Sequence, residues 1–265
     1  MIIAATAAAA LPVFIAKGKR PGEMQKAPFW GKNFAHRGLH TVDKKVPENS
    51  LEAFRLASEA GYGMELDVQL SKDGYVVVFH DDDLKRVCGV DSRVDEKTLA
   101  ELQELRLCGS EYTIPLFSQV LETIAGRGPL IVELKNGRRN KELCEKTYAL
   151  LKNYKGDVCV ESFNPFIVAW FRFHAKELLR GQLAAPAEEY KYMPKAEGFI
   201  LSSTMLNFIA RPNFIAYKIG KRPVLVRLSE ALGAMKVGWT SHNPVSEKGR
   251  DAVIFEFYKP ELKYK

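Results

Sequence analysis

The sequence has only four cysteines, and none of them is spaced for a metal or redox motif. Cys88, Cys108, Cys144 and Cys159 lie far apart, with no C-x-x-C pair among them. This pattern argues against a zinc site and against a disulfide-dense secreted scaffold. We therefore expect free, buried thiols in a reducing compartment.

The chain also lacks a basic run with interleaved aromatic residues, which is the usual signature of a nucleic-acid surface. Its 265 residues carry 39 Lys and Arg against 32 Asp and Glu, a net charge of +7. This excess favours anionic partners such as phosphate esters or an acidic membrane face. Because the charges are scattered, we predict no nucleic-acid partner, and a nucleic-acid phosphodiesterase is a less favoured interpretation.

A third absence is an apolar run long enough to span a membrane, which needs about 20 residues. Residues 2–16 are uncharged and mostly apolar, but they number 15 and contain Pro12, which would interrupt a helix. Three interpretations remain open: a short membrane anchor, a truncated signal-like segment, or a poorly ordered tail. We favour a weak anchor that contacts a membrane through residues 2–16. The cations Lys17, Lys19 and Arg20 would then keep the remaining chain on the cytoplasmic side.

No internal repeat, low-complexity segment or linker follows Pro21, and the composition is that of a globular protein. We therefore divide the chain into an apolar N-terminal segment with its linker, residues 1–28, and one domain, residues 29–265. The expected location is membrane-associated or cytoplasmic, in a bacterium. The sequence leaves the oligomeric state open.

What the sequence does contain is an alternation of short Val-, Ile- and Phe-rich runs with segments of helical period, which is typical of a βαβα chain. Eight strands are predicted, beginning at Asn33, Tyr62, Leu130, Asp157, Arg180, a position within 199–217, Val237 and Ala252. Eight strands with intervening helices in about 240 residues predict an α/β protein of the (β/α)8 TIM-barrel class.

Two local features refine this prediction. Tyr62–Leu70 and Tyr75–His80 are separated by a turn too short for a parallel crossover, so we expect a β-hairpin on the rim after the second strand. The helix that precedes this hairpin is expected to begin with Asn49 as its N-cap, with Glu52 completing a capping box.

Three carboxylates stand at positions that should face the barrel interior. Glu65 and Asp67 are two residues apart on one strand, so both point to the same side, opposite their apolar neighbours. Glu133 and Lys135 repeat this geometry on another strand. Carboxylates this close would repel each other unless a cation neutralised them, and a hard divalent ion, Mg or Ca, fits oxygen ligands. The alternatives are rim acids paired with Lys or Arg, and a simple Glu133–Lys135 ion pair.

Two histidines follow strands near the expected barrel mouth. His36-Arg37-Gly38 follows the first strand, and His80-Asp81 ends the hairpin. Two imidazoles can supply the base and the acid that phosphodiester cleavage needs, while Arg37 can bind phosphate oxygens in bidentate fashion.

The remaining histidines have no such context. His40, His174 and His242 are interpreted as surface or structural residues.

Eight short motifs occur in a recognisable order: His36-Arg37, Pro47-Glu48-Asn49-Ser50, Glu65-x-Asp67, Lys72-Asp73-Gly74, His80-Asp81, Glu133-x-Lys135, Ser162-Phe163 and Trp239-Thr240. In this order the chain resembles the glycerophosphodiester phosphodiesterases, from about Phe29 to the C-terminus. Among them it looks most like the bacterial members with an apolar N-terminal segment. The resemblance implies a TIM barrel that hydrolyses small-molecule glycerophosphodiesters to glycerol 3-phosphate and an alcohol.

The resemblance also implies roles for single residues. Glu65, Asp67 and Glu133 would hold a divalent cation, Mg or Ca.

For the remaining site residues it implies that His36 and His80 perform acid/base chemistry. Arg37 and Lys135 would grip the phosphate, Glu48 would orient the site, and Trp239 would line the glycerol pocket.

The chain departs from the family pattern after Trp239 and at Glu256, which leaves the choice of substrate open. Two alternative functions are carried forward. One is a lysophospholipase D-type activity on lipids, which would suit the apolar segment and the net charge. The other is a barrel that binds phosphodiesters without catalysis, which the presence of both histidines and all three acids disfavours.

Overall fold

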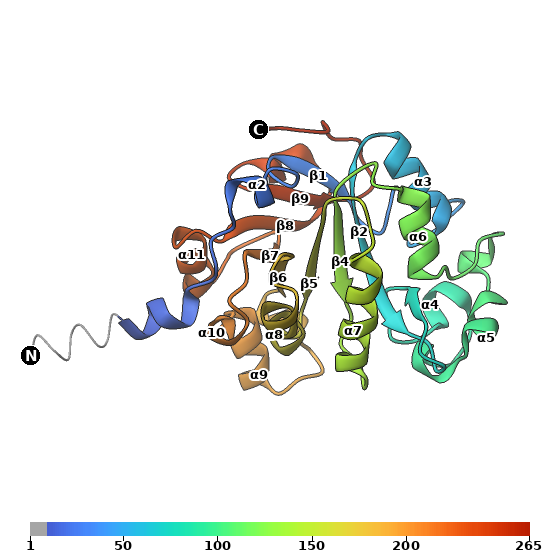
Figure 1. Cartoon of the computed structure of the whole chain (residues 1–265), viewed down its shortest axis with the longest axis horizontal. Helices are drawn as coiled ribbons and strands as arrows, with labels where there is room; N and C mark the ends of the chain where they lie inside the picture. Colours follow the sequence, from blue (N-terminus) through green and yellow to red (C-terminus); the bar gives the residue numbers. More distant parts are fainter. Residues whose placement is uncertain (1–9) are drawn as a thin grey trace, which may run out of the picture.

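Eight parallel strands close into a barrel within residues 10–265, the part of the chain that this computed structural model describes (Figure 1). The strands of the sheet are β1 (Lys32–Ala35), β2 (Gly63–Leu70), β3 (Val76–Val78), β4 (Leu130–Leu134), β5 (Val158–Ser162), β6 (Leu179–Ala184), β7 (Phe214–Lys218), β8 (Met235–Ser241) and β9 (Ala252–Phe255). β1 pairs in parallel with both β9 and β2, which closes the ring β1-β9-β8-β7-β6-β5-β4-β2. The predicted (β/α)8 barrel is confirmed.

Helices connect and surround the strands. They are α2 (Glu23–Lys26), α3 (Leu51–Glu59), α4 (Lys85–Cys88), α5 (Leu99–Gln103), α6 (Phe117–Ile124), α7 (Asn140–Leu151), α8 (Pro165–His174), α9 (Lys195–Ser202), α10 (Asn207–Ala210) and α11 (Val224–Ala231), with short 3-10 turns at Val94–Glu96, Leu107–Gly109, Ala187–Glu189 and Pro244–Glu247. The chain around residues 10–16 is also helical.

β3 is the one strand of the described sheet outside the ring. It pairs antiparallel with β2, with Val68 opposite Val78. The chain that follows β3 forms a satellite lobe with its own buried apolar cluster, which includes Leu84, Val94 and Leu102. This lobe brings α4 over the barrel mouth, and its Arg86 reaches the site described below.

The two faces of β2 have opposite chemistry, as its sequence alternation predicts. Met64, Leu66 and Val68 are fully buried against the apolar faces of the surrounding helices. Glu65 and Asp67 therefore point into the barrel, where they are also buried.

The barrel interior is divided into an apolar layer and an acidic layer. Towards the amino ends of the strands, Phe34, Ile131, Cys159 and Phe214 pack together. Two residues further along β4 and β5, the inward positions carry acids instead. Since active sites of such barrels lie at the carboxyl ends of the strands, the acidic layer occupies the expected position.

The predicted N-cap of the helix before the hairpin needs correction. α3 begins with Ser50 as its N-cap, because the Ser50 hydroxyl accepts a hydrogen bond from the Ala53 amide. Asn49, the predicted cap, lies one residue earlier in the left-handed region, with φ of 56°.

The predicted membrane contact through residues 2–16 falls partly on residues 1–9, which lie outside the described residues. No helix among residues 10–265 is both long enough and apolar enough to cross a membrane. All four cysteines are free thiols, with Cys144 and Cys159 buried and the other two half-buried.

Candidate active site

Three carboxylates converge inside the barrel. Glu65, Asp67 and Glu133 each offer an oxygen, and these oxygens all lie within 4.8 Å of one another. The pairing of β2 with β4 places Asp67 level with Glu133, so the two strands deliver their acids at one height. All three side chains are buried, with exposed fractions of 3%, 1% and 6%.

Burial and mutual repulsion determine the protonation of this group. Burial, followed by the charges of Asp67 and Glu133, raises the pKa of Glu65 well above its ordinary value. Burial also raises the pKa of Glu133, although Lys135 opposes the shift. Asp67 differs: burial opposes ionisation, but His80, Lys135 and Arg37 together lower its pKa. Without a further cation the cluster therefore favours one charged acid over three.

Two cationic side chains border the acids. Lys135 lies on the next inward position after Glu133, and its Nζ is 2.9 Å from Glu133 Oε1 and 3.5 Å from Asp67 Oδ1. Arg37 follows β1, and its Nε is 3.6 Å from Asp67 Oδ2. The backbone amide of Arg37 donates a 3.0 Å hydrogen bond to Glu65 Oε2. Lys135 is thus shared by two acids and is not restricted to Glu133.

Asn49 contributes a contact that its predicted capping role did not foresee. Its Nδ2 donates a 2.9 Å hydrogen bond to Asp67 Oδ2. The other oxygen of that carboxylate, Oδ1, is buried and has no hydrogen-bond partner among the described residues. Lys135 Nζ lies 3.5 Å away without forming a hydrogen bond, so this buried oxygen is available to a ligand or cation.

Glu48 is held in an arginine network at the edge of the acidic layer. Arg37 Nη1 donates to Glu48 Oε1 at 2.7 Å, and Arg86 of α4 donates to both Glu48 oxygens at 2.6 and 2.8 Å. Despite burial, these two arginines lower the pKa of Glu48 to about 2. Glu48 therefore stays ionised and fixes the orientation of Arg37.

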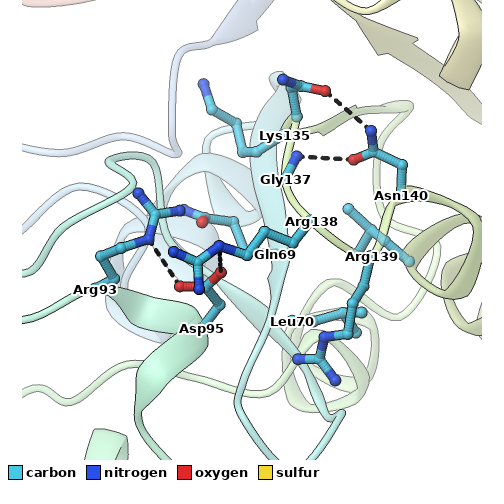
Figure 2. A pocket seen from close by; sticks show the side chains of 11 residues that line it. Gln69, Leu70, Arg93, Asp95, Lys135, Gly137, Arg138, Arg139 and Asn140 are labelled. Atoms are coloured by element: carbon cyan, nitrogen blue, oxygen red, sulfur yellow. Dashed lines mark hydrogen bonds and ion pairs between the residues drawn. The ribbon is translucent and has the colours of Figure 1, made fainter.

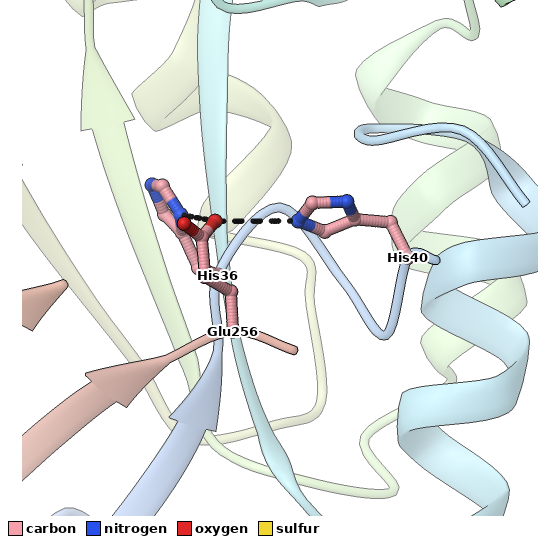
Figure 3. Close-up of side chains that lie close together, drawn as sticks. All are labelled: His36, His40 and Glu256. Carbon is pink, nitrogen blue, oxygen red and sulfur yellow. Dashed lines mark hydrogen bonds and ion pairs between the residues drawn. The ribbon is translucent and has the colours of Figure 1, made fainter. Parts of the chain in front are cut away.

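His36 is paired with Glu256, the residue that departs from the family pattern (Figure 3). Its Nδ1 lies 2.8 Å from Glu256 Oε2. Glu256 directly follows β9, the strand that pairs with β1. Burial lowers the pKa of His36 to about 4, against the opposing hydrogen bond to Glu256. At neutral pH the imidazole is uncharged, so Nδ1–H donates to the carboxylate and Nε2 keeps a free lone pair.

His40, interpreted from the sequence as surface or structural, belongs to the same cluster. Its Nε2 is 3.5 Å from Glu256 Oε2, and the side chain is largely buried. Figure 3 shows Glu256 between the two imidazoles. The loop after β1 returns His40 to the barrel mouth, which its sequence position did not indicate.

His80 follows β3 and is more exposed than His36. Its Nδ1 lies 2.6 Å from Asp81 Oδ1, and Arg86 holds Asp81 through a 2.6 Å hydrogen bond from Nε. His80 is close enough to Asp67 and Glu133 to influence the pKa of both. His36 is likewise influenced by Asp67, so both imidazoles neighbour the same acids.

Trp239 lies further along the barrel mouth, on β8. Its Nε1 donates to the Ala216 carbonyl at 3.1 Å, and its ring meets Phe163 edge-on with centroids 5.7 Å apart. No hydrogen bond or ion pair among the described residues joins Trp239 to the acids. With Phe163, it forms an aromatic pair where β5 and β8 end.

Glu161 is a site residue that the sequence reading missed. The β4–β5 pairing places it level with Glu133, and it is 2% exposed. Burial, followed by the charges of Glu133 and Asp67, raises its pKa well above the ordinary value. The available signal was its position two residues after Cys159, the same inward alternation that identified Glu133.

A polar pocket adjoins the site on the β2 and β4 side (Figure 2). Asp95 there accepts from Arg93 at 2.9 Å and lies 4.0 Å from Arg138. Lys135 extends away from this ion-pair cluster in Figure 2. The ion-pair cluster therefore connects the loop after β4 to the satellite lobe. Lys135 is paired with Asp67 and Glu133 instead.

Fold and site together define a (β/α)8-barrel protein with a charged, hydrolase-type centre at the carboxyl ends of its strands. The sequence profile described as "Glycerophosphoryl diester phosphodiesterase family" matches residues 36–257. The chain belongs to this family, whose members are phosphoric diester hydrolases.

Known relatives agree with this assignment. The chain is 36% identical to a glycerophosphodiester phosphodiesterase of Caldanaerobacter subterraneus subsp. tengcongensis, over 50% of this chain and 58% of the relative. It is 32% identical to a human lysophospholipase D, over 50% of this chain and 44% of the relative. The chain thus spans only about half the length of the curated relatives that it matches.

A solved structure covers more of the chain. An Oleispira antarctica phosphodiesterase, determined in complex with the product sn-glycerol-3-phosphate, superposes with a TM-score of 0.70 at 26% identity. The superposition covers 87% of this chain and 94% of that one.

Proposed function

We propose that the protein is a metal-dependent phosphodiesterase that hydrolyses glycerophosphodiesters to glycerol 3-phosphate and an alcohol. Residues 29–265 would form the catalytic domain. The observation that carries this proposal is the convergence of the carboxylate oxygens of Glu65, Asp67 and Glu133, with an imidazole on each of two strand ends near Asp67. The relative that binds sn-glycerol-3-phosphate supports the same product class.

The three acids fit a divalent cation, Mg or Ca. Their oxygens lie within 4.8 Å of one another, and Asp67 Oδ1 is buried without a hydrogen-bond donor. An all-oxygen donor set is typical of hard cations. When bound, such a cation would polarise the phosphate and neutralise charge that develops on its oxygens.

The cationic side chains of the chain would hold the substrate phosphate. Lys135 would act as a point charge, and Arg37 would present its guanidinium in the orientation that Glu48 imposes. Both cations contact Asp67, next to the position proposed for the phosphate.

The two histidines would move the protons. His36, neutral at pH 7 and oriented by Glu256, is suited to act as a base through Nε2. His80, held by Asp81, would then donate a proton to the leaving alkoxide. The nucleophile is either the substrate's own glycerol hydroxyl, which gives a cyclic product that water opens, or water itself.

A second candidate function, lysophospholipase D-type activity, is favoured by one specific feature. An apolar cavity of about 410 Å³ opens beside the barrel mouth, lined by residues that include Phe163, Phe166 and Leu201. Asn136, the residue after Lys135, also lines it, so one edge of the cavity lies near the proposed phosphate-binding residue Lys135. A hydrocarbon chain attached to the substrate would fit this cavity, and the human relative is a lysophospholipase D.

Parallel assays of soluble glycerophosphocholine and of a lysophospholipid separate the two candidates. Glycerol 3-phosphate release from the first substrate supports the leading proposal. Preference for the second, with release of the free alcohol head group, supports the alternative. Leu201→Asp, which places a charge in the apolar cavity, should impair only the lipid reaction. Binding of either substrate without turnover would make the protein a non-catalytic barrel.

A further inference from the structure

A second cavity, of about 600 Å³, is lined almost entirely by cations. Seven of its eight lining residues are Lys or Arg, and the eighth is Gly18. The cations come from segments far apart in the sequence: Lys17 and Lys19 from the N-terminal segment, Lys176 from the α8–β6 connection, and Arg211 from the residue after α10. Folding therefore gathers like charges here against their mutual repulsion.

These charges are not compensated by the protein. No ion pair among residues 10–265 involves any of the seven cations. Two of the arginines donate hydrogen bonds to backbone carbonyls instead. Arg180 Nη2 donates to the Arg211 carbonyl at 2.9 Å, and Arg172 Nη1 donates to the Ile209 carbonyl at 2.6 Å. Backbone carbonyls fix the positions of the arginines but leave their net charge available to an anion.

Arg180 shows that the cavity is a built feature. Its side chain is 2% exposed, which is rare for an arginine without a carboxylate partner. Burial, followed by the charge of Arg172, lowers the pKa of Arg180 to about 10. A bound anion would relieve both effects.

The cavity is separate from the candidate active site. Arg180 stands at the amino end of β6, and its amide bonds to the side chain of Asn213, which precedes β7. The acids and histidines stand at the carboxyl ends of the strands, at the opposite end of the barrel. An anion bound here would not touch the proposed reaction.

An exposed apolar helix adjoins the cavity. In the helical segment 10–16, Leu11 and Phe14 are 60% and 53% exposed, and the segment projects from the body in Figure 1. Arg211 joins the helix to the cavity, because its Nη1 donates to the carbonyls of Phe14 and Lys17 at 2.8 and 2.6 Å. Apolar side chains beside clustered cations are typical of a surface that lies on an anionic bilayer.

We propose that this cavity binds the phosphate of an anionic phospholipid headgroup, while the helix at residues 10–16 lies in the bilayer interface. Free phosphate would contact only the cations. The adjoining apolar helix therefore favours a lipid as the ligand. The surface is a contact on one leaflet and requires no membrane-spanning segment.

Sedimentation of the full chain with vesicles tests this proposal. Vesicles of phosphatidylcholine with about one-third phosphatidylglycerol should bind the protein, and vesicles of phosphatidylcholine alone should not. The triple variant Lys17→Gln, Lys19→Gln, Lys176→Gln removes three exposed cavity charges and spares the bonded arginines. It should bind anionic vesicles about 100-fold more weakly, since each basic residue near such a surface contributes about 1 kcal/mol.

A matched control changes the same net charge elsewhere. Lys141→Gln, Lys152→Gln, Lys155→Gln alters exposed lysines in and after α7 and should bind vesicles within about threefold of wild type, at unchanged phosphodiesterase turnover. Equal loss in both triple variants, or equal binding to uncharged vesicles, would overturn the proposal. So would saturation by millimolar inorganic phosphate with no vesicle binding, which would identify a free-anion site.

The apolar helix is tested separately. Leu11→Ser with Phe14→Ser should weaken vesicle binding without changing the fold.

Discussion

Glu161 and Glu133 stand level with each other on adjacent strands, and both are buried inside the barrel. Only Glu133 lies in the group of three converging carboxylates and only it is paired with Lys135. Burial and the neighbouring acids raise the pKa of Glu161 well above its ordinary value, which favours its protonated form. Two acids of the same kind, in the same layer, are thus expected to behave differently.

Exchange of each acid for its amide tests this difference. Gln is isosteric with the protonated form that burial favours at Glu161, so Glu161→Gln should keep kcat/KM within about threefold of wild type. Glu133→Gln removes a carboxylate proposed to bind the divalent cation and should lower kcat/KM by roughly 10²–10³-fold. Steady-state assays of both variants at pH 7 are sufficient. Equal losses would show that Glu161 is also required as a carboxylate.

The pairing of His36 with Glu256 predicts a pH dependence. A base must be neutral, so activity should be lost as the pH falls through about 4, the lowered pKa of His36. Glu256 partly opposes this lowering, so Glu256→Gln should lower the pKa further and move the acid limb of kcat/KM to lower pH. The plateau should fall about 10-fold or more, because Nδ1–H loses a charged acceptor. A limb that moves to higher pH would contradict the assignment.

The two histidines should be energetically coupled. Each proton transfer is worth roughly 10²–10⁴-fold, so His36→Ala or His80→Ala should each cost about 3–5 kcal/mol of transition-state stabilisation. The double variant should lose less than the sum, because both groups serve one displacement. A double-mutant cycle on kcat/KM measures this coupling. Unchanged turnover in His80→Ala would contradict the role of His80 and would make Asp81 or water the candidate proton donor.

The acidic cluster predicts a stability change of definite sign. Burial, together with Asp67 and Glu133, raises the pKa of Glu65 in the folded state, so its contribution to stability is full below the unfolded pKa and is lost as pH rises. Glu65→Gln should therefore unfold a few degrees above wild type in chelator, with a difference that grows from pH 5 to 8. Saturating Mg or Ca should raise the Tm of wild type by about 5–10 °C and that of the variant by less.

Circular dichroism melts with and without chelator provide this comparison. Asp67→Asn is a poor substitute, because the pKa of Asp67 is lowered and loss of its charge would remove a carboxylate that both Lys135 and Arg37 contact. A variant less stable than wild type at pH 8 in chelator would contradict the account of repulsion within the cluster.

The sequence predicted those features that depend on strand alternation. Glu65 and Asp67 were recognised as sharing a face because apolar residues alternate with them, and the structure places both inside the barrel. The eight-strand barrel followed from counting such runs. Glu161 obeys the same alternation, but no charged residue follows it two positions later, as Asp67 follows Glu65 and Lys135 follows Glu133.

Contacts between distant segments could not be predicted in this way. Arg86 reaches Glu48 across 38 residues because the satellite lobe folds back over the mouth, and no local pattern encodes that path. His40 likewise approaches Glu256 only after the loop following β1 has turned. Asn49 has a side chain suited to a helix N-cap. However, Ser50 caps α3, and Asn49 donates a hydrogen bond to Asp67 instead.

The central claim is that three buried acids hold a divalent cation that phosphodiester cleavage requires. Its most direct test is glycerol 3-phosphate release from glycerophosphocholine by the wild-type protein, measured after exhaustive chelation and again after addition of Mg or Ca. The account predicts that activity falls to background in chelator and returns on addition of one of these ions, while Glu65→Gln stays inactive in both conditions. Full turnover in excess chelator would contradict it.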